Sequence, residues 1–176
     1  LYVDKPDFAV RDTAVFAKNH PKDVQIQMLR GRALYANKDI REAKKVLSEV
    51  VLLDRNQSEA HAFLGLIHKE EGKLSRATKS FERAIDINSK SAMAYHGLGQ
   101  VFVEEEKYQE AINMQNKALS IDPGLRDAYF YMGVAYKALG KEAEADEAFS
   151  KSVPVDGIDG LSNPKDLDKA YKNFRK

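Results

Sequence analysis

Small and bulky apolar residues recur along the chain with a period of 34 residues. Alanine keeps one register of this period, glycine keeps a second, and bulky apolar residues keep two more. The alanines are Ala9, Ala43, Ala77, Ala111 and Ala145, the glycines are Gly31, Gly65, Gly99 and Gly133, and the bulky residues are Val51, Ile85, Leu119, Val153 and Leu53, Ile87, Ile121, Val155. A period of this length holds two helices and their turns, so the pattern predicts an all-α array of helix pairs, an α-solenoid.

Within one period the apolar residues follow helical spacing. Tyr95, Leu98 and Phe102 are separated by three and four residues, which places them on one face of a helix. Gly99 lies on the same face and predicts a close approach of the partner helix. Ala111 is the small residue that we expect to accept this approach from the second helix.

The period also sets the expected domain boundaries. A half repeat with only a second helix precedes four full repeats, and a segment rich in Pro and Gly then breaks the pattern. The boundaries are 6–23 for the half repeat and 24–57, 58–91, 92–125 and 126–157 for the full repeats, giving a solenoid over 1–157, with a linker and capping helix over 158–176. Asn163 and Pro164 fit the N-cap and first position of that last helix, which would cover the apolar end of the solenoid.

Two stretches at first resemble a phosphate-binding loop. Residues 65–73 and 133–141 each contain a Gly, six further residues, a second Gly and a Lys. A phosphate loop has four intervening residues and a Ser or Thr after the Lys, whereas an apolar and an acidic residue follow here. We therefore interpret Gly72 and Gly140 as left-handed helix caps, and we predict no nucleotide cofactor.

Composition narrows the classes of partner and compartment. The formal net charge is +1, so the overall electrostatic field of the protein does not favour binding to nucleic acid. No apolar run reaches the length of about 18 residues that a membrane span needs. Cys is absent, which excludes disulfides and Cys-ligated zinc. No signal-peptide pattern is visible, and the chain starts at Leu1 rather than Met, so a targeting signal could precede it. These observations leave both the cytoplasm and the periplasm open.

No catalytic or metal-binding residues are predicted. His61 and His68 are seven residues apart and could share a helix face, but the His-Glu-x-x-His pattern of zinc enzymes is missing. The adjacent Glu104, Glu105 and Glu106 point in different directions on a helix and favour a solvated turn. No Gly-x-Ser-x-Gly nucleophile motif is present. The sequence therefore predicts a non-enzymatic protein without cofactor or metal.

The chain resembles the tetratricopeptide repeat family over nearly its whole length. The family pattern is W-x2-L-G-x2-Y on the first helix and A-x3-F-x2-A on the second. The repeat at 92–125 fits this pattern with Tyr95, Leu98, Gly99, Phe102, Ala111 and Ala118. Departures are Gln115 at the Phe position, His61 and His68 at aromatic positions, Gln27 and Arg30 at apolar positions, and Ser152 in place of Ala. The resemblance implies a right-handed superhelix of antiparallel helix pairs whose first helices line a concave groove.

The resemblance also implies which residues line that groove. In the family a fixed set of first-helix positions faces the bound peptide. Among the positions transferred to this sequence, the residues expected to bind the peptide are Met28, Arg32, Tyr35, Ala62, Leu66, Lys69, Met93, His96, Gln100, Phe130, Val134 and Lys137. Apolar residues form the centre and charged residues the rim, which suits an amphipathic helix or an extended peptide. The Lys and Asn clamp of chaperone-binding members is absent, so a chaperone adaptor is not expected.

The amino-terminal half repeat predicts self-association. Phe8, Val15 and Phe16 lie on a second helix whose own first helix is missing. Large exposed apolar surface marks interaction sites, and the groove of another copy offers an apolar partner. Such a contact joins two different surfaces, so it closes into rings or continues as filaments. We therefore expect a homo-oligomer.

The half repeat followed by four full repeats is similar in layout to a bacterial group of magnetosome-associated scaffolds within the family. Members are cytoplasmic and assemble on an organelle membrane. The resemblance implies a protein or peptide ligand, self-assembly, and peripheral association with a membrane rather than insertion. Two alternatives stay open: a periplasmic lipoprotein of secretion or pilus assembly, and the adaptor domain of a larger enzyme.

Overall fold

The computed structural model describes residues 6–152, with side chains from Val10 onward. The expected capping helix within 158–176 and the side chain of Phe8 lie outside the described residues.

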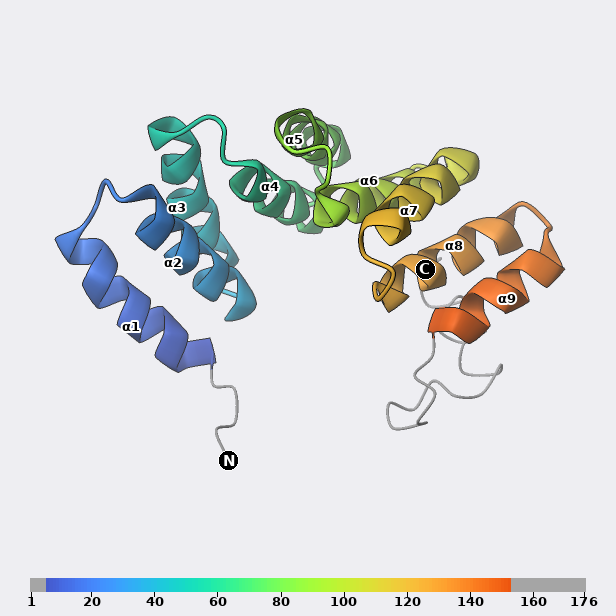
Figure 1. Cartoon of the computed structure of the whole chain (residues 1–176), viewed down its shortest axis with the longest axis horizontal. Helices are drawn as coiled ribbons and strands as arrows, with labels where there is room; N and C mark the ends of the chain where they lie inside the picture. Colours follow the sequence, from blue (N-terminus) through green and yellow to red (C-terminus); the bar gives the residue numbers. More distant parts are fainter. Residues whose placement is uncertain (1–5, 153–176) are drawn as a thin grey trace. The chain divides into compact units, whose positions relative to one another are not determined.

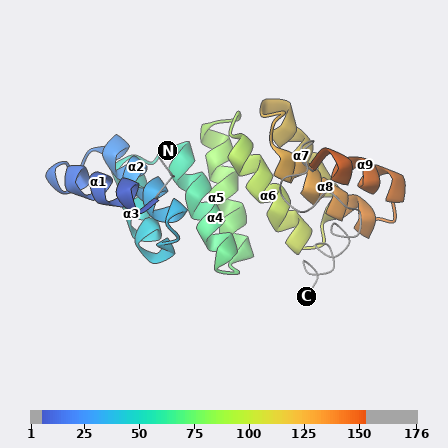
Figure 2. The same ribbon diagram turned by 90° about the horizontal axis from the view of Figure 1, so that it is seen from below.

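The described residues form helices joined by short turns (Figure 1). They are α1 (Pro6–Asn19), α2 (Val24–Ala36), α3 (Ile40–Leu53), α4 (Ser58–Glu70), α5 (Leu74–Ile87), α6 (Ala92–Glu104), α7 (Tyr108–Ile121), α8 (Arg126–Ala138) and α9 (Glu142–Ser152). Consecutive helices pack in pairs, with α2 against α3, α4 against α5 and α8 against α9 (Figure 2). The predicted all-α fold of helix pairs is confirmed.

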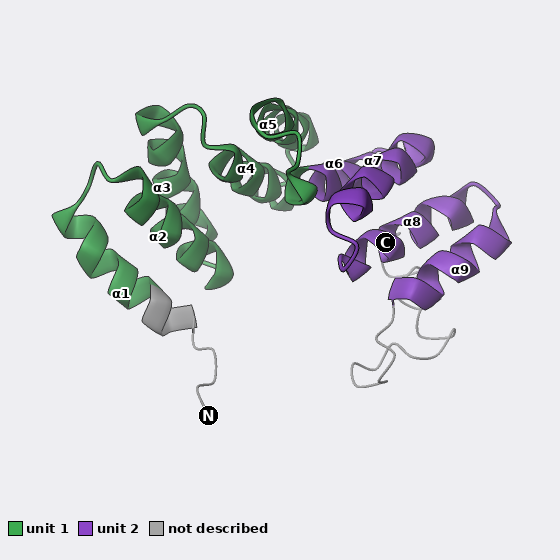
Figure 3. Ribbon diagram, viewed as in Figure 1, with its two compact units in different colours: residues 1–94 green, residues 95–176 purple. Residues whose placement is uncertain are grey.

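The chain divides into two compact units, residues 1–94 and 95–176 (Figure 3). Unit 1 contains α1 to α5, and unit 2 contains most of α6 and all of α7 to α9. The division falls inside α6, within the repeat expected at 92–125. The solenoid expected over 1–157 and its repeat boundaries stay predictions. Each unit is described separately below.

The turn after each first helix contains one residue with a left-handed backbone. Gly72 and Gly140 have φ of 70° and 72°, which confirms their interpretation as helix caps. Lys38 and Glu106 occupy the corresponding positions of the other two repeats and have φ of 64° and 61°. Residues other than Gly rarely adopt this backbone conformation. The geometry of the repeat therefore imposes it on Lys38 and Glu106, where the sequence has no Gly.

The glycine register marks the closest approach between the two helices of a repeat. A Cβ built on Gly31 would lie 2.6 Å from a side-chain carbon of Leu47 on α3, and one on Gly133 would lie 2.6 Å from the ring of Phe149 on α9. These contacts confirm that the glycines serve packing. Around them each unit has its own apolar core, with fully buried Leu47 and Ile67 in unit 1 and with Ala135 and Ala145 in unit 2.

Candidate peptide-binding surface

In unit 1, polar side chains connect the first helices of two successive repeats. The Arg32 guanidinium on α2 lies 3.4 Å from a carboxylate oxygen of Glu59 on α4. One turn further along, the Tyr35 hydroxyl donates to Glu70 Oε1 at 2.5 Å, and the Tyr35 ring meets Phe63 edge-on at a centroid distance of 5.3 Å. Arg32 and Tyr35, both predicted from the sequence, therefore lie on one surface shared by α2 and α4.

The hydrogen bond from Tyr35 to Glu70 is strengthened by its surroundings. Burial raises the pKa of Tyr35 well above its ordinary value, and the carboxylate of Glu70 raises it further. The hydroxyl therefore stays protonated and remains a donor at physiological pH. Lys69 and Lys137 are half-buried and occupy the same repeat position as Tyr35 in the second and fourth repeats.

In each unit, the apolar part of the candidate surface is narrower than the sequence predicted. Met28, Ala62 and Val134 keep 4%, 1% and 2% of their surface exposed, so their side chains pack in the interior and cannot contact a peptide. Met28 belongs to the apolar core of unit 1, and Val134 belongs to that of unit 2. Leu66 and Phe130 are half-buried, and Met93 is 37% exposed. Leu66 and Met93 are therefore the apolar candidate residues of unit 1, and Phe130 is that of unit 2.

In unit 2, three polar residues form a hydrogen-bonded chain between α6 and α7. His96 Nδ1 lies 2.8 Å from Gln115 Oε1, and Gln100 Nε2 lies 2.8 Å from His96 Nε2. Gln115 Nε2 donates to the His96 carbonyl at 3.3 Å, which fixes the orientation of that amide. Gln115 Oε1 must then accept from His96 Nδ1–H, so the imidazole is the neutral Nδ1–H tautomer.

This chain of polar groups changes the expected roles of two candidate groove residues. Gln100 is only 8% exposed and Gln115 is fully buried. The hydrogen bonds between His96 and Gln115 join α6 to α7, and Gln100 binds the second ring nitrogen of His96 from within α6. Gln115 replaces the aromatic residue of the repeat pattern, and its partner His96 explains how a buried amide is accommodated there.

An aromatic cluster on α8 includes a residue that sequence reasoning missed. Phe130 packs edge-on against Tyr131 at 5.6 Å and lies 5.8 Å from the Phe149 ring. Tyr131 also meets His96 edge-on at 5.7 Å, joining α6 to α8. Burial raises the pKa of Tyr131, and the nearby carboxylates of Glu104 and Asp127 add to the effect. Tyr131 directly follows Phe130, and the set of positions transferred from the family did not include it.

The amino-terminal helix presents the apolar surface that the sequence predicted. Val15 is 64% exposed and Phe16 is 62% exposed. Val50, Ala84 and Ala118 occupy the Phe16 position of the next three repeats and are fully buried. In those repeats a first helix of the same repeat packs against the second helix, whereas α1 has no preceding first helix among the described residues.

Neither a metal-binding cluster nor a membrane-spanning helix is found in the described part of the chain. Across residues 6–152 no group of three or more His, Asp or Glu side chains is arranged to hold a metal ion. Within the same residues, none of the helices combines the length and apolar character that crossing a bilayer requires.

Comparison with protein families gave three matches. A model described as "Tetratricopeptide repeat" matches residues 29–92, one described as "TPR repeat" matches 99–140, and another "Tetratricopeptide repeat" model matches 127–156. No curated protein matched the chain.

Solved structures with similar folds include two crystal structures of MamA. One is 28% identical with a TM-score of 0.68, covering 95% of this chain and 85% of that one. The other is 26% identical with a TM-score of 0.69, and both chains are covered completely. A mutant O-GlcNAc transferase of Thermobaculum terrenum is 23% identical with a TM-score of 0.62, covering 64% of this chain and 22% of that one.

Proposed function

Because the chain belongs to the tetratricopeptide repeat family, a family of protein-interaction scaffolds, we propose that it is a non-catalytic, self-assembling scaffold of the MamA-like kind. It binds a helical or extended peptide on the surface of its first helices. The observation that carries self-assembly is the exposure of Phe16 at a position that is fully buried in the next three repeats.

The peptide-binding surface combines half-exposed apolar residues with charged neighbours. In unit 1, Leu66 and Met93 supply the apolar contacts and Arg32 and Lys69 lie on the rim. In unit 2, Phe130 supplies the apolar contact of that unit's own surface. An apolar centre with a polar rim is the usual anatomy of a peptide interface. The amino-terminal helix of a second copy, with Val15 and Phe16 on its exposed face, has the matching chemistry.

In this proposal the protein is cytoplasmic and associates with a magnetosome membrane through its partners. The similarity to MamA structures supports this role. The second candidate is an adaptor domain of a longer enzyme, supported by the partial match to an O-GlcNAc transferase. That match covers about two thirds of this chain, and at 23% identity it concerns the fold.

Complementary variants test the assembly. Val15→Asp/Phe16→Asp removes the amino-terminal contact, and Met93→Glu or Phe130→Glu removes the peptide-binding surface. Each variant alone should be a monomer in light scattering. A mixture of the two kinds should form a 1:1 dimer and nothing larger, because one intact surface remains on each. Loss of a buried apolar anchor weakens an interface by about 2 kcal/mol or more.

Controls separate assembly from folding. Leu52→Glu changes a residue that is 79% exposed and belongs to neither surface, so it should leave the mass unchanged. Circular dichroism should give the same helix content for all variants, and Met93→Glu provides a second test should Phe130→Glu disturb the packing against Phe149. If the mixture stays monomeric while each variant is folded, the two surfaces do not bind one another.

A further inference from the structure

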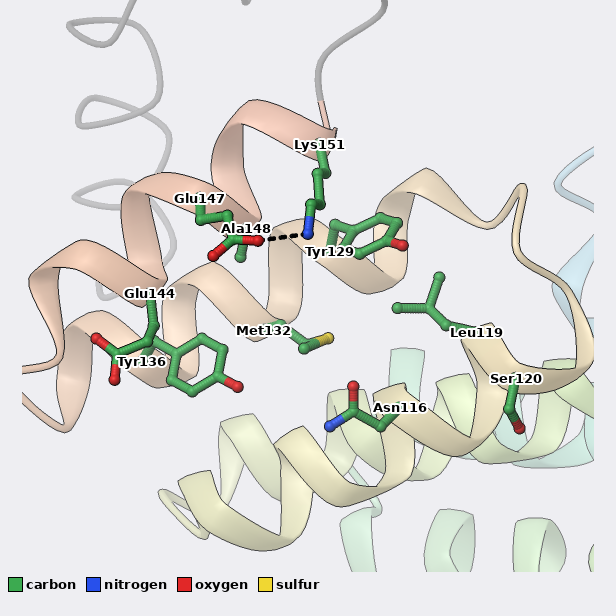
Figure 4. A pocket seen from close by; sticks show the side chains of 10 residues that line it. All are labelled: Asn116, Leu119, Ser120, Tyr129, Met132, Tyr136, Glu144, Glu147, Ala148 and Lys151. Carbon is green, nitrogen blue, oxygen red and sulfur yellow. Dashed lines mark hydrogen bonds and ion pairs between the residues drawn. The ribbon is translucent and has the colours of Figure 1, made fainter.

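A cleft of about 430 Å³ opens between α7, α8 and α9 in unit 2 (Figure 4). Its floor is apolar: Met132 and Ala148 are buried there, and Leu119 is half-buried. None of the predicted peptide-binding residues lines this cleft. It is therefore a second concave surface with a chemistry of its own.

The walls of the cleft carry two tyrosine rings and two carboxylates. Tyr129 and Tyr136 come from α8, and Glu144 and Glu147 come from α9. Figure 4 shows the Glu144 side chain beside Tyr136. Aromatic faces and carboxylates both attract cations, so the lining favours a cationic group with apolar neighbours.

Lys151 of the chain itself already occupies the part of the cleft formed by Glu147 and Tyr129. The Lys151 ammonium lies 2.6 Å from Glu147 Oε1 and 5.7 Å from the centre of the Tyr129 ring (Figure 4). The other half is different: Glu144 forms no ion pair with any residue between 6 and 152. One carboxylate therefore stays available to an incoming cation, whereas the adjacent Tyr136 ring already has the Lys141 ammonium 5.9 Å from its centre.

The packing of the repeat does not require the charged and aromatic residues that line the cleft. The positions of Glu144, Glu147 and Lys151 are occupied 68 residues earlier by Arg76, Lys79 and Arg83. Those three positions carry a charge of −1 in unit 2 and +3 in unit 1. The two tyrosine positions hold His61 and His68 in unit 1. Because the same fold accepts the opposite charge, the acidic and aromatic lining is a property of this cleft.

We propose that the cleft binds an arginine or lysine side chain of a partner polypeptide, with the cation against the Glu144 carboxylate. Apolar residues on either side of that cation would contact Leu119 and Met132. This site is separate from the peptide-binding surface, so one copy could hold a basic segment of a partner while it assembles with other copies. The single carboxylate and open cleft suit a weak, salt-sensitive contact.

Two blocked tripeptides test the proposal by NMR on the full chain. The probe is leucyl-arginyl-leucine amide, and the matched probe is leucyl-glutaminyl-leucine amide. The arginine peptide should shift the methyl signals of Met132 and Ala148 in a saturable way, and added salt should weaken its binding. The glutamine peptide should bind at least about tenfold more weakly, since the charge contacts are lost.

Variants assign the binding to the carboxylates. Glu144→Gln/Glu147→Gln should weaken the arginine peptide about tenfold, as expected for the loss of surface charge contacts. Glu110→Gln is the matched control, because Glu110 is an exposed carboxylate at the Glu144 position of the preceding repeat and lies outside the cleft. Tyr136→Phe keeps the ring and should keep the binding.

The proposal fails if the arginine peptide gives no saturable shift, or if the glutamine peptide shifts the same signals with equal affinity. It also fails if Glu110→Gln weakens binding as much as the double variant does. All changes are at exposed side chains or conserve the ring, and the methyl spectrum reports directly that each variant is folded. The peptide-binding surface is unaffected by these variants, so failure here is distinguishable from failure of the scaffold assembly.

Discussion

The ring of Phe81 lies directly against the backbone of Gly65, and a Cβ built on Gly65 would come within 2.6 Å of a ring carbon. Phe81 is fully buried, so its ring is enclosed by other side chains of the core. The contact joins the middle of α4 to the middle of α5 and sets the distance between these two helices.

We expect Gly65→Ala to lower the free energy of unfolding in spite of the better helix propensity of Ala. Overpacking costs about 1–3 kcal/mol, whereas the propensity gain is at most about 1 kcal/mol. In a Phe81→Ala background the same change should be much less harmful, because the ring atoms that meet the new methyl group are gone and no longer side chain replaces them. Urea denaturation of the four proteins measures this coupling, and additive effects would contradict the packing explanation.

The stability of unit 1 should fall on mild acidification. Burial lowers the pKa of His61 and His68 below their ordinary value of 6.5, and the nearby cations Arg83 and Lys44 contribute in the same direction. In folded protein these imidazoles bind protons less readily than in the unfolded chain. The unfolded state is therefore favoured as the pH falls through about 6.5 toward the lower folded-state values.

The matched variant replaces both histidines by the residues found two repeats later. Tyr129 and Tyr136 occupy these positions in the fourth repeat, where Lys151 and Lys141 lie over the rings. His61→Tyr/His68→Tyr should lose less stability between about pH 7 and pH 5 than the wild type does. Thermal denaturation at both pH values checks this, and equal pH dependence of the two proteins would exclude the histidines as its cause.

His96 and Gln115 should be energetically coupled. Gln115→Phe alone removes the acceptor of His96 Nδ1–H, and a buried group left without its partner costs about 1–3 kcal/mol. The double change His96→Phe/Gln115→Phe copies the neighbouring Phe130 and Phe149 of the fourth repeat, whose rings lie 5.8 Å apart. A double-mutant cycle should therefore give a coupling of about 0.5–3 kcal/mol. Independent effects of the two changes would contradict it.

Removal of residues 1–20 should leave a folded but less stable monomer. Gln27 Nε2 donates to the carbonyls of Ala17 and His20 at 3.3 and 3.5 Å, and both acceptors are lost in the truncated chain. Light scattering and thermal denaturation measure both effects. Unfolding of the truncated chain would show that α1 is required for the fold.

The all-α fold, the helix pairs and the packing role of the glycines follow from the amino-acid sequence alone. The period of 34 residues is strict, and the positions of Gly65 and Phe81 within it leave few other ways to pack two helices. Gly72 and Gly140 were predictable for the same reason. Lys38 and Glu106 were not, because their own preference is against a left-handed backbone, and the repeat geometry overrides it.

The binding surface could not be obtained in the same way. Periodicity places Met28, Ala62 and Val134 on the expected face, but they are buried because of how the neighbouring helices pack. Similarly, the sequence marked Gln115 as a departure from the family pattern without indicating that His96 is its partner, since the two residues lie on different helices. The acidic and aromatic cleft joins side chains of three helices. Local pattern fixes the secondary structure, whereas exposure and pairing arise from contacts between residues distant in the chain.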